Sequence, residues 1–138
     1  MTSPRVEIVR EILAEWNRGD VDALLARATE DLEWHPVLVE AVEGETFHGH
    51  DGFREFLSDW GSTWESWDLE PEEMRELGDQ VLVLTRVRAK GRGSGVEFDQ
   101  LLGHLFEFRG ELICRGETFL DRDKAVQVAE SRVNRVGS

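Results

Sequence analysis

Four long segments of alternating apolar and polar residues fill the second half of the chain, and they constrain its fold most. They run over about residues 67–76, 80–90, 96–108 and 112–120. Turn signals separate them at Gly78-Asp79, between residues 91 and 95, and at Arg109-Gly110. This pattern predicts antiparallel strands joined by short turns. Because the strands are long, the sheet should twist and curl strongly.

The first half of the chain is mostly helical by the spacing of its apolar residues. One amphipathic helix is predicted from about Pro4 to Asn17, with Ser3 as its N-cap and Gly19 at its end. Asp20 begins a short second helix, which should pack on the first as a hairpin. A third helix begins at Asp51. Its apolar stripe is heavily aromatic and contains Phe53, Phe56, Leu57, Trp60 and Trp64.

Two short strands and a terminal helix complete the order of elements. The segment Leu32 to Val39 is strand-like, and Pro36 within it indicates an edge or a bulge. Thr46 to His48 should pair with it, and Asp121 to Ser131 forms a short C-terminal helix. The order is α-α-β-β-α-β-β-β-β followed by that helix. It predicts an α+β fold in one domain, residues 1–138, with a curved antiparallel sheet packed on three or four helices collected on one face.

Composition excludes several classes of partner. The 138 residues carry a net charge of -13, so the chain cannot neutralise phosphates, and we expect neither nucleic acid nor an anionic membrane as a partner. The only cysteine, Cys114, cannot form an internal disulfide and is expected to be a small buried apolar residue. There is no apolar segment for export at the start of the sequence and none long enough to span a membrane, so we expect a cytoplasmic protein.

No motif in the sequence indicates a cofactor or a metal. We find no phosphate-binding loop, nucleophile elbow or HExxH pattern. The run His48-Gly49-His50-Asp51 places two histidines only two residues apart, in a turn before a helix. We therefore interpret it as a turn in which Asp51 caps the helix, and we expect no metal site and no cofactor.

The third long segment allows its side chains to be sorted by face. Bulky residues share one face, which we place inward: Phe98, Gln100, Leu102, His104, Phe106 and Phe108. His104 and Gln100 would then lie among aromatic side chains. A buried imidazole needs a hydrogen-bond partner, and Gln100 or Thr118 on the next strand could supply it.

The segment before it has two faces that both begin apolar. One face carries Val81, Val83, Thr85, Val87 and Ala89, and the other carries Leu82, Leu84, Arg86 and Arg88. Periodicity does not decide which is inward. If the second face is inward, both arginines enter the interior. The outward valines, beside Leu101 and Leu105, would then need a cover that a homodimer could supply.

Five short stretches carry a resemblance to a known family. They are Trp16-Asn17-Arg18-Gly19-Asp20, residues 32–36 (LEWHP), 47–52 (FHGHDG), 106–110 (FEFRG) and 119–122 (FLDR). In this order they resemble the nuclear transport factor 2-like superfamily, and within it the SnoaL-like polyketide cyclase group. The resemblance implies a cone-like half barrel with a deep pocket between sheet and helices. It also implies a homodimer through the outer sheet face, which favours an inward position for Arg86 and Arg88.

The resemblance also implies roles for individual residues. His35 takes the place of the general-base aspartate of ketosteroid isomerases, while Ile12 stands where they carry an oxyanion-hole tyrosine. Arg86 and Arg88 resemble the strand pair of limonene-epoxide hydrolases. His104 resembles the histidine of SnoaL-type cyclases. The acidic partner that limonene-epoxide hydrolases and SnoaL-type cyclases carry corresponds to Thr118 in this chain. The chain therefore departs from the catalytic patterns of all three enzyme groups.

Our leading hypothesis is a pocket for a small, mostly apolar molecule that is oxygenated or anionic. If the protein is an enzyme, it should perform cofactor-free isomerisation, cyclisation, dehydration or epoxide opening. His35 or His104 would move the proton, and Arg86 or Arg88 would stabilise oxyanion charge. The expected ligand contacts are Trp34, Trp60, Trp64, Gln100, Leu102, Phe106, Thr118 and Phe119.

Each of these residues also has a purely structural interpretation. The histidines could anchor strands, the arginines could pair with acidic neighbours such as Asp99, and aromatic stripes at helical spacing are usually core. The alternatives to an enzyme are therefore a non-catalytic binding protein of the same fold and a structural dimer with a filled core.

Overall fold

The computed structural model describes residues 3–36, 46–93 and 95–136. Its elements are, in chain order, α1 (Pro4–Arg18), α2 (Val21–Ala26), β1 (Ala28–His35), β2 (Phe47–His48), α3 (Gly49–Thr63), β3 (Trp64–Leu77), β4 (Gln80–Gly91), β5 (Glu97–Arg109), β6 (Leu112–Phe119) and α4 (Arg122–Val136). This is the predicted α+β order. The predicted part of the first strand beyond Pro36 lies outside the described residues.

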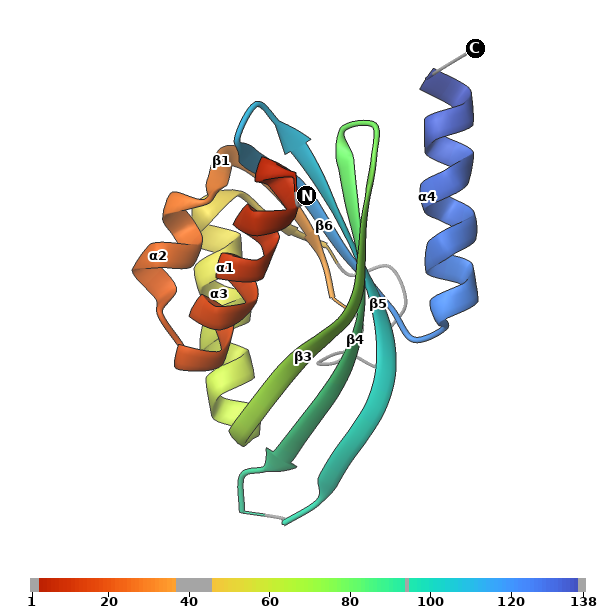
Figure 1. The fold of residues 1–138 in the computed structure, drawn as a ribbon. Coiled ribbons are helices and arrows are strands. Elements are labelled where there is room, and N and C mark those ends of the chain that lie inside the picture. Colours follow the sequence, from red (N-terminus) through yellow and green to blue (C-terminus); the bar gives the residue numbers. More distant parts are fainter. Residues whose placement is uncertain (1–2, 37–45, 94, 137–138) are drawn as a thin grey trace.

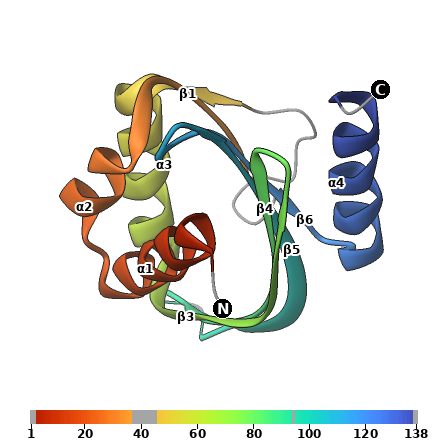
Figure 2. The ribbon, with the colours of Figure 1, turned by 45° about the horizontal axis from the view of Figure 1, so that its top comes forward.

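One six-stranded sheet has the order β2-β1-β6-β5-β4-β3. All neighbours are antiparallel except β1 and β6, which run parallel. The sheet curls around α1, α2 and α3, which occupy its concave side (Figures 1 and 2). The expectation that the helices would share one face is wrong for α4, which lies on the convex side.

Helix α1 is fixed by hydrogen bonds at both of its ends. The Ser3 hydroxyl accepts a hydrogen bond from the Val6 backbone N–H at 3.1 Å, and Gly19 ends the helix at φ 68°. The side-chain amide of Asn17 accepts from the Leu69 N–H and donates to the Leu69 carbonyl. These two bonds cover backbone groups on the edge strand β3, which would otherwise be open to pairing with other chains.

Helix α3 begins two residues before the position that the sequence indicated. Its N-cap is His48, and Asp51 lies within the first turn, where it pairs with Arg54 at 3.3 Å. The prediction that Asp51 caps the helix is therefore wrong. Among the described residues no cluster of metal-ligating side chains is found, and His50 instead bonds the Ala28 carbonyl through Nε2 at 3.0 Å.

The inner face of β4 is the one that starts at Val81. Val81, Val83, Thr85 and Val87 are all fully buried, and they pack in the core with the helices on the concave side. Arg86 and Arg88 therefore point to the convex side, where both side chains are about half exposed. This corrects the inward position that the resemblance favoured. Burying the valine side chains is favourable, whereas burying two guanidinium groups without partners would cost much free energy.

Helix α4 covers the middle of the convex face. Ala125 and Ala129 are fully buried against Leu82 and Leu105. The helix can come this close because β5 has a glycine beneath it: a Cβ atom at Gly103 would lie 2.5 Å from the Cβ of Ala125. The cover that the convex face needs is thus partly supplied by the chain itself.

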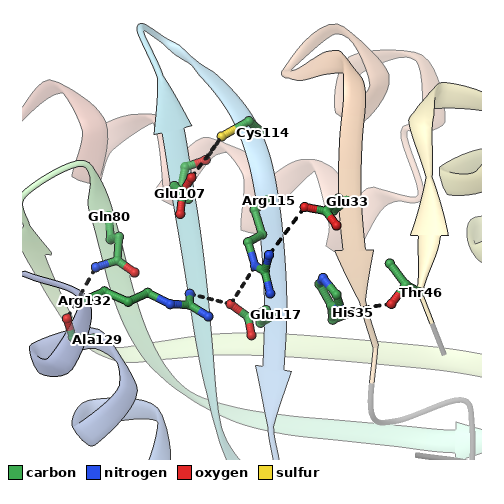
Figure 3. A network of polar contacts seen from close by, with 10 residues as sticks. All are labelled: Glu33, His35, Thr46, Gln80, Glu107, Cys114, Arg115, Glu117, Ala129 and Arg132. Carbon is green, nitrogen blue, oxygen red and sulfur yellow. Dashed lines mark hydrogen bonds and ion pairs between the residues drawn. The ribbon is translucent and has the colours of Figure 1, made fainter. Parts of the chain in front are cut away.

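Polar contacts attach the C-terminal half of α4 to the sheet. Arg132 donates to Glu117 at 2.5 Å, and Gln80 donates to the Ala129 carbonyl at 3.4 Å (Figure 3). Arg115 bridges Glu117 on its own strand and Glu33 on β1. Burial acts to raise the pKa of Glu117, but the hydrogen bonds and charges of the two arginines outweigh it and hold that pKa below its usual value.

No helix in the described part of the chain is long and apolar enough to span a membrane. Cys114 is buried, as predicted, and its thiol lies 3.5 Å from the Glu107 carbonyl oxygen. The register of β5 and β6 shifts between Glu107 and Phe108, so Cys114 is the extra residue of a β-bulge.

Candidate functional site

A cavity of about 50 Å³ lies between the three concave-side helices and the sheet. Most of its wall is apolar and aromatic. The helices contribute Ile12, Leu13, Trp16, Leu24, Phe53, Phe56 and Trp60, and the strands contribute Leu32, Trp34, Leu69, His104, Phe106, Ile113 and Thr118. An apolar cavity of about 150 Å³ admits benzene, so an aromatic ligand can enter this smaller one only if side chains move.

His104 is a polar group in the wall of the cavity. Its Nε2 lies 2.9 Å from the Thr85 hydroxyl, and its Nδ1 lies 3.2 Å from the Thr118 hydroxyl. The Thr85 hydroxyl also reaches the Leu102 carbonyl at 3.5 Å. Since that carbonyl can only accept, we assign the N–H of His104 to Nε2 and the acceptor role to Nδ1.

This environment keeps His104 uncharged at neutral pH. Burial lowers the pKa of His104 to about 4, and no described carboxylate lies close enough to oppose the effect. The expected partner Thr118 is confirmed by the geometry, whereas Gln100 is exposed and contacts neither the histidine nor the cavity. His104 is therefore a neutral hydrogen-bonding group in an apolar wall.

Three tryptophans in the wall carry indole N–H groups that find no acceptor. The Nε1 atoms of Trp16, Trp34 and Trp60 are buried, and none has a hydrogen-bond partner among the described residues. The buried Nε1 of Trp64, which does not line the cavity, also has no partner among the described residues, whereas the Nε1 of Trp67 donates to the Trp16 carbonyl at 2.8 Å. Buried donors without partners are costly and uncommon in folded proteins. Ring faces nearby are much weaker acceptors than oxygen.

One charged residue of the described chain, Arg27, contributes to the cavity wall. It follows α2, and its guanidinium group is held by two carboxylates of α1. Nε and Nη2 donate to Glu15 at 3.2 Å and 2.8 Å, and Nη2 also donates to Glu11 at 2.6 Å. The hydrogen bond to Glu15 is the main reason that the pKa of Arg27 is raised above its ordinary value.

His35 lies outside the cavity. Its Nδ1 is 3.1 Å from the Thr46 hydroxyl, which joins the end of β1 to the start of β2. Figure 3 shows it beside the convex-face network of Arg115 and Glu117. Burial is the largest cause that lowers the pKa of His35, and the positive charge of Arg115 adds to it. This placement matches the structural interpretation, a histidine that anchors a strand.

Arg86 and Arg88 also lie away from the cavity. Arg86 forms a two-pronged pair with Asp99, with both N–O distances 3.0 Å, and Arg88 pairs with Glu70 at 3.5 Å. Asp99 was an expected partner in the structural interpretation. The hydrogen bond to Asp99 raises the pKa of Arg86 and, in turn, lowers that of Asp99.

The structure separates the remaining predicted contacts. Trp34, Trp60, Phe106 and Thr118 line the cavity. Trp64 and Leu102 are buried in the adjoining core without lining it. Phe119 packs on the convex side with α4, because residues that follow one another on β6 alternate between the faces.

Sequence reasoning missed Trp16 and Arg27 as wall residues. Trp16 belongs to the apolar stripe of α1, and a stripe alone does not show which of its members stand next to an unfilled volume. The position of Arg27 in the wall could not be predicted, because it depends on the pairing with Glu15 of α1. The geometry of the turn that brings the two residues together is not determined by the local sequence.

The family follows from comparison with known proteins. A model of the SnoaL-like domain matches residues 9–116. The chain belongs to the SnoaL-like domain family. Among curated proteins, no significant match to the chain is found. The predicted resemblance to SnoaL-like and nuclear transport factor 2-like proteins is thus confirmed.

Solved structures of the same fold are numerous. An NTF2-like protein of unknown function from Burkholderia pseudomallei K96243 is 25% identical, with a TM-score of 0.77 over 93% of this chain and 98% of that chain. TerC, co-crystallised with polyporic acid, is 26% identical, with a TM-score of 0.75 over 93% and 99%. The epoxide hydrolase/cyclase-like enzyme SalBIII, with a role in pyran ring formation in salinomycin, is 21% identical with a TM-score of 0.71 over 85% and 90%, and shows the fold alone.

Proposed function

We propose that this SnoaL-like protein binds a small, mostly apolar molecule that carries an acceptor oxygen, within the cavity on the concave side. One observation carries the proposal: three buried indole N–H groups in the wall lack an acceptor among the residues that the structure describes. A carbonyl or ether oxygen inside the cavity would satisfy one or more of them, while the aromatic walls would hold the apolar remainder. The similarity to TerC, which was co-crystallised with polyporic acid, supports a small organic molecule as the ligand.

Binding accounts for the wall better than acid/base catalysis does. In the described wall, His104 is the one histidine, both of its nitrogens are occupied by threonines, and no carboxylate stands beside it. His35, Arg86 and Arg88, which the sequence suggested as its companions, lie elsewhere. Isomerase or cyclase chemistry would need a second proton-transfer group next to the substrate.

A filled structural core is the second candidate. Two observations favour it: the cavity has a volume of only about 50 Å³, and both candidate arginines lie in solvent on the convex side. If the protein has a filled core, no ligand enters the cavity, and the unpaired indole N–H groups are a loss of hydrogen bonding that aromatic packing outweighs.

The homodimer through the outer sheet face stays a prediction. Val81, Val83 and Val87 are internal, so they do not need the cover of a second subunit. Beyond α4 the convex face still exposes Leu101, at 45% of its surface, among ion pairs such as Arg86–Asp99. Light scattering after size exclusion would give the mass of the particle in solution.

A pair of isosteric probes tests the binding proposal. Acetophenone carries a carbonyl oxygen where α-methylstyrene carries a CH₂ group, so the two differ in one hydrogen-bond acceptor. We expect acetophenone to bind about 3- to 10-fold more tightly in an NMR titration, the value of one net hydrogen bond. A protein that binds neither probe would support the filled core.

Substitutions then locate the donor. Trp16→Phe, Trp34→Phe and Trp60→Phe each remove one unpartnered N–H, and at least one of them should abolish the preference for acetophenone. Trp67→Phe is the matched control, because its N–H is already bonded to the Trp16 carbonyl. A preference that survives all three substitutions would contradict the proposal.

A further inference from the structure

Arg27 contributes to the cavity wall, and Nε and Nη2 of its guanidinium group are already engaged by carboxylates. Glu15 holds it with two hydrogen bonds, and Glu11 adds a third from the solvent side. The Glu15 side chain is only 10% exposed, whereas that of Glu11 is 59% exposed. The inner partner of Arg27 is therefore a buried carboxylate, held against a residue of the cavity wall.

We infer that Glu15 makes the cavity selective for uncharged ligands by occupying the one cation in its described wall. The inference rests on the proposed function and deepens it, because it names the charge class of the ligand. The sequence left two ligand classes open, oxygenated and anionic molecules, and the inference favours the uncharged oxygenated class.

The charges around the wall support this selectivity. Arg27 brings one positive charge and its two partners bring two negative charges, so the cluster is negative overall. His104 stays neutral at pH 7, and Arg86 and Arg88 face the convex side. An anion entering the wall would lose its hydration without gaining an unoccupied cation, and it would approach the buried carboxylate of Glu15.

Backbone hydrogen bonds hold both members of the pair in place. Glu15 belongs to the last turns of α1, and its carbonyl accepts the Asp20 N–H at 3.0 Å where the chain turns into α2. Arg27 ends that helical hairpin, and its carbonyl accepts the Ile113 N–H of β6 at 2.8 Å. Both partners are thus fixed through their backbones, and the two-pronged geometry favours their pairing over exchange with a ligand.

The unaltered protein gives the first test. Benzoate matches acetophenone in shape but carries a full negative charge at pH 7. We expect benzoate to bind at least about tenfold more weakly than acetophenone in the same NMR titration, a ratio equivalent to about 1.4 kcal/mol. Benzoate binding as tight as that of acetophenone would overturn the inference while leaving the proposed function intact.

A charge-neutral variant gives the second test. Glu15→Gln removes the negative charge that pairs with the Arg27 guanidinium group. The affinity for benzoate should therefore rise at least about tenfold, while the affinity for acetophenone should change by less than about threefold. Glu11→Gln is the matched control: it removes the same charge at the exposed position and should change the benzoate affinity by less than about threefold.

A double variant assigns the gain to Arg27. E15Q/R27Q keeps a neutral hydrogen-bonding pair, and its benzoate affinity should fall back to the wild-type level. A benzoate affinity that does not rise in E15Q, with acetophenone still bound, would overturn the inference. If acetophenone binds to none of the proteins, the proposed function itself fails and the inference falls with it.

Discussion

The six-membered ring of Trp34 occupies the space that a side chain at residue 116 would fill. A Cβ atom at Gly116 would overlap two ring carbons, Cζ3 and Cε3. The two residues face each other in the parallel pairing of β1 and β6. The absence of a side chain at Gly116 is what allows an indole ring to lie on the concave surface and form part of the cavity wall.

Gly116→Ala should therefore be strongly destabilising. The added methyl group must displace the Trp34 ring, and overpacking of this kind costs about 1–3 kcal/mol of unfolding free energy. Urea denaturation measures the loss. Gly61→Ala is the control, because no described atom outside its chain neighbours and the backbone of α3 lies within 4 Å of its Cβ position. The control should leave stability unchanged or raise it by up to about 1 kcal/mol. Equal effects of the two substitutions would contradict the packing described here.

His104 should make the stability of the protein depend on pH. Its pKa is about 4 in the folded state, against about 6.5 for an unfolded imidazole. Between these pH values the imidazole is protonated in the unfolded chain but not in the folded protein. The unfolding free energy therefore falls as the pH falls through this range. From pH 7 to pH 5 the loss due to His104 is about 2 kcal/mol.

Denaturation of variants at the two pH values isolates this contribution. His104→Gln keeps groups that can bond to both threonines, and it should remove about 2 kcal/mol of the pH-dependent loss. His48→Gln, at an exposed position, should retain the wild-type dependence. A His104→Gln protein that loses as much stability on acidification as the wild type would show that the imidazole is not held neutral.

The contact between Arg132 and Glu117 should matter for the attachment of α4. Their side chains are 24% and 13% exposed, and the pair joins the helix to β6. Arg132→Ala should lower the unfolding free energy by about 1–2 kcal/mol, because Glu117 loses a partner in a poorly solvated place. Arg109→Ala breaks a pair with Asp31 in which both side chains are more than 60% exposed, and it should have no measurable effect.

Much of the fold could be predicted from the sequence because its signals are local. The turns at Gly78 and Gly110 and the Ser3 cap each depend on neighbouring residues, and the structure confirms them. The inward position of His104 followed from the bulky residues around it on the same strand face.

The errors arose where the outcome depends on contacts between distant segments. The facing of β4 was ambiguous because Leu82 and Leu84 are as apolar as the valines, and both leucines are explained by α4, which packs on them from the far end of the chain. Phe119 was placed on the wrong side for the same reason. The orphan indole groups could not be predicted, since an unpaired donor is a property of the whole packed wall.

The most direct test of the binding proposal is the response of the indole N–H signals to acetophenone in ¹H–¹⁵N NMR spectra. If the carbonyl oxygen accepts a hydrogen bond in the cavity, the ¹H signal of at least one among Trp16, Trp34 and Trp60 should shift downfield in a saturable way. The signal of Trp67, whose N–H is already bonded, should stay in place. Saturable binding with no larger shift at the three wall tryptophans than at Trp67, or no binding at all, would contradict the account.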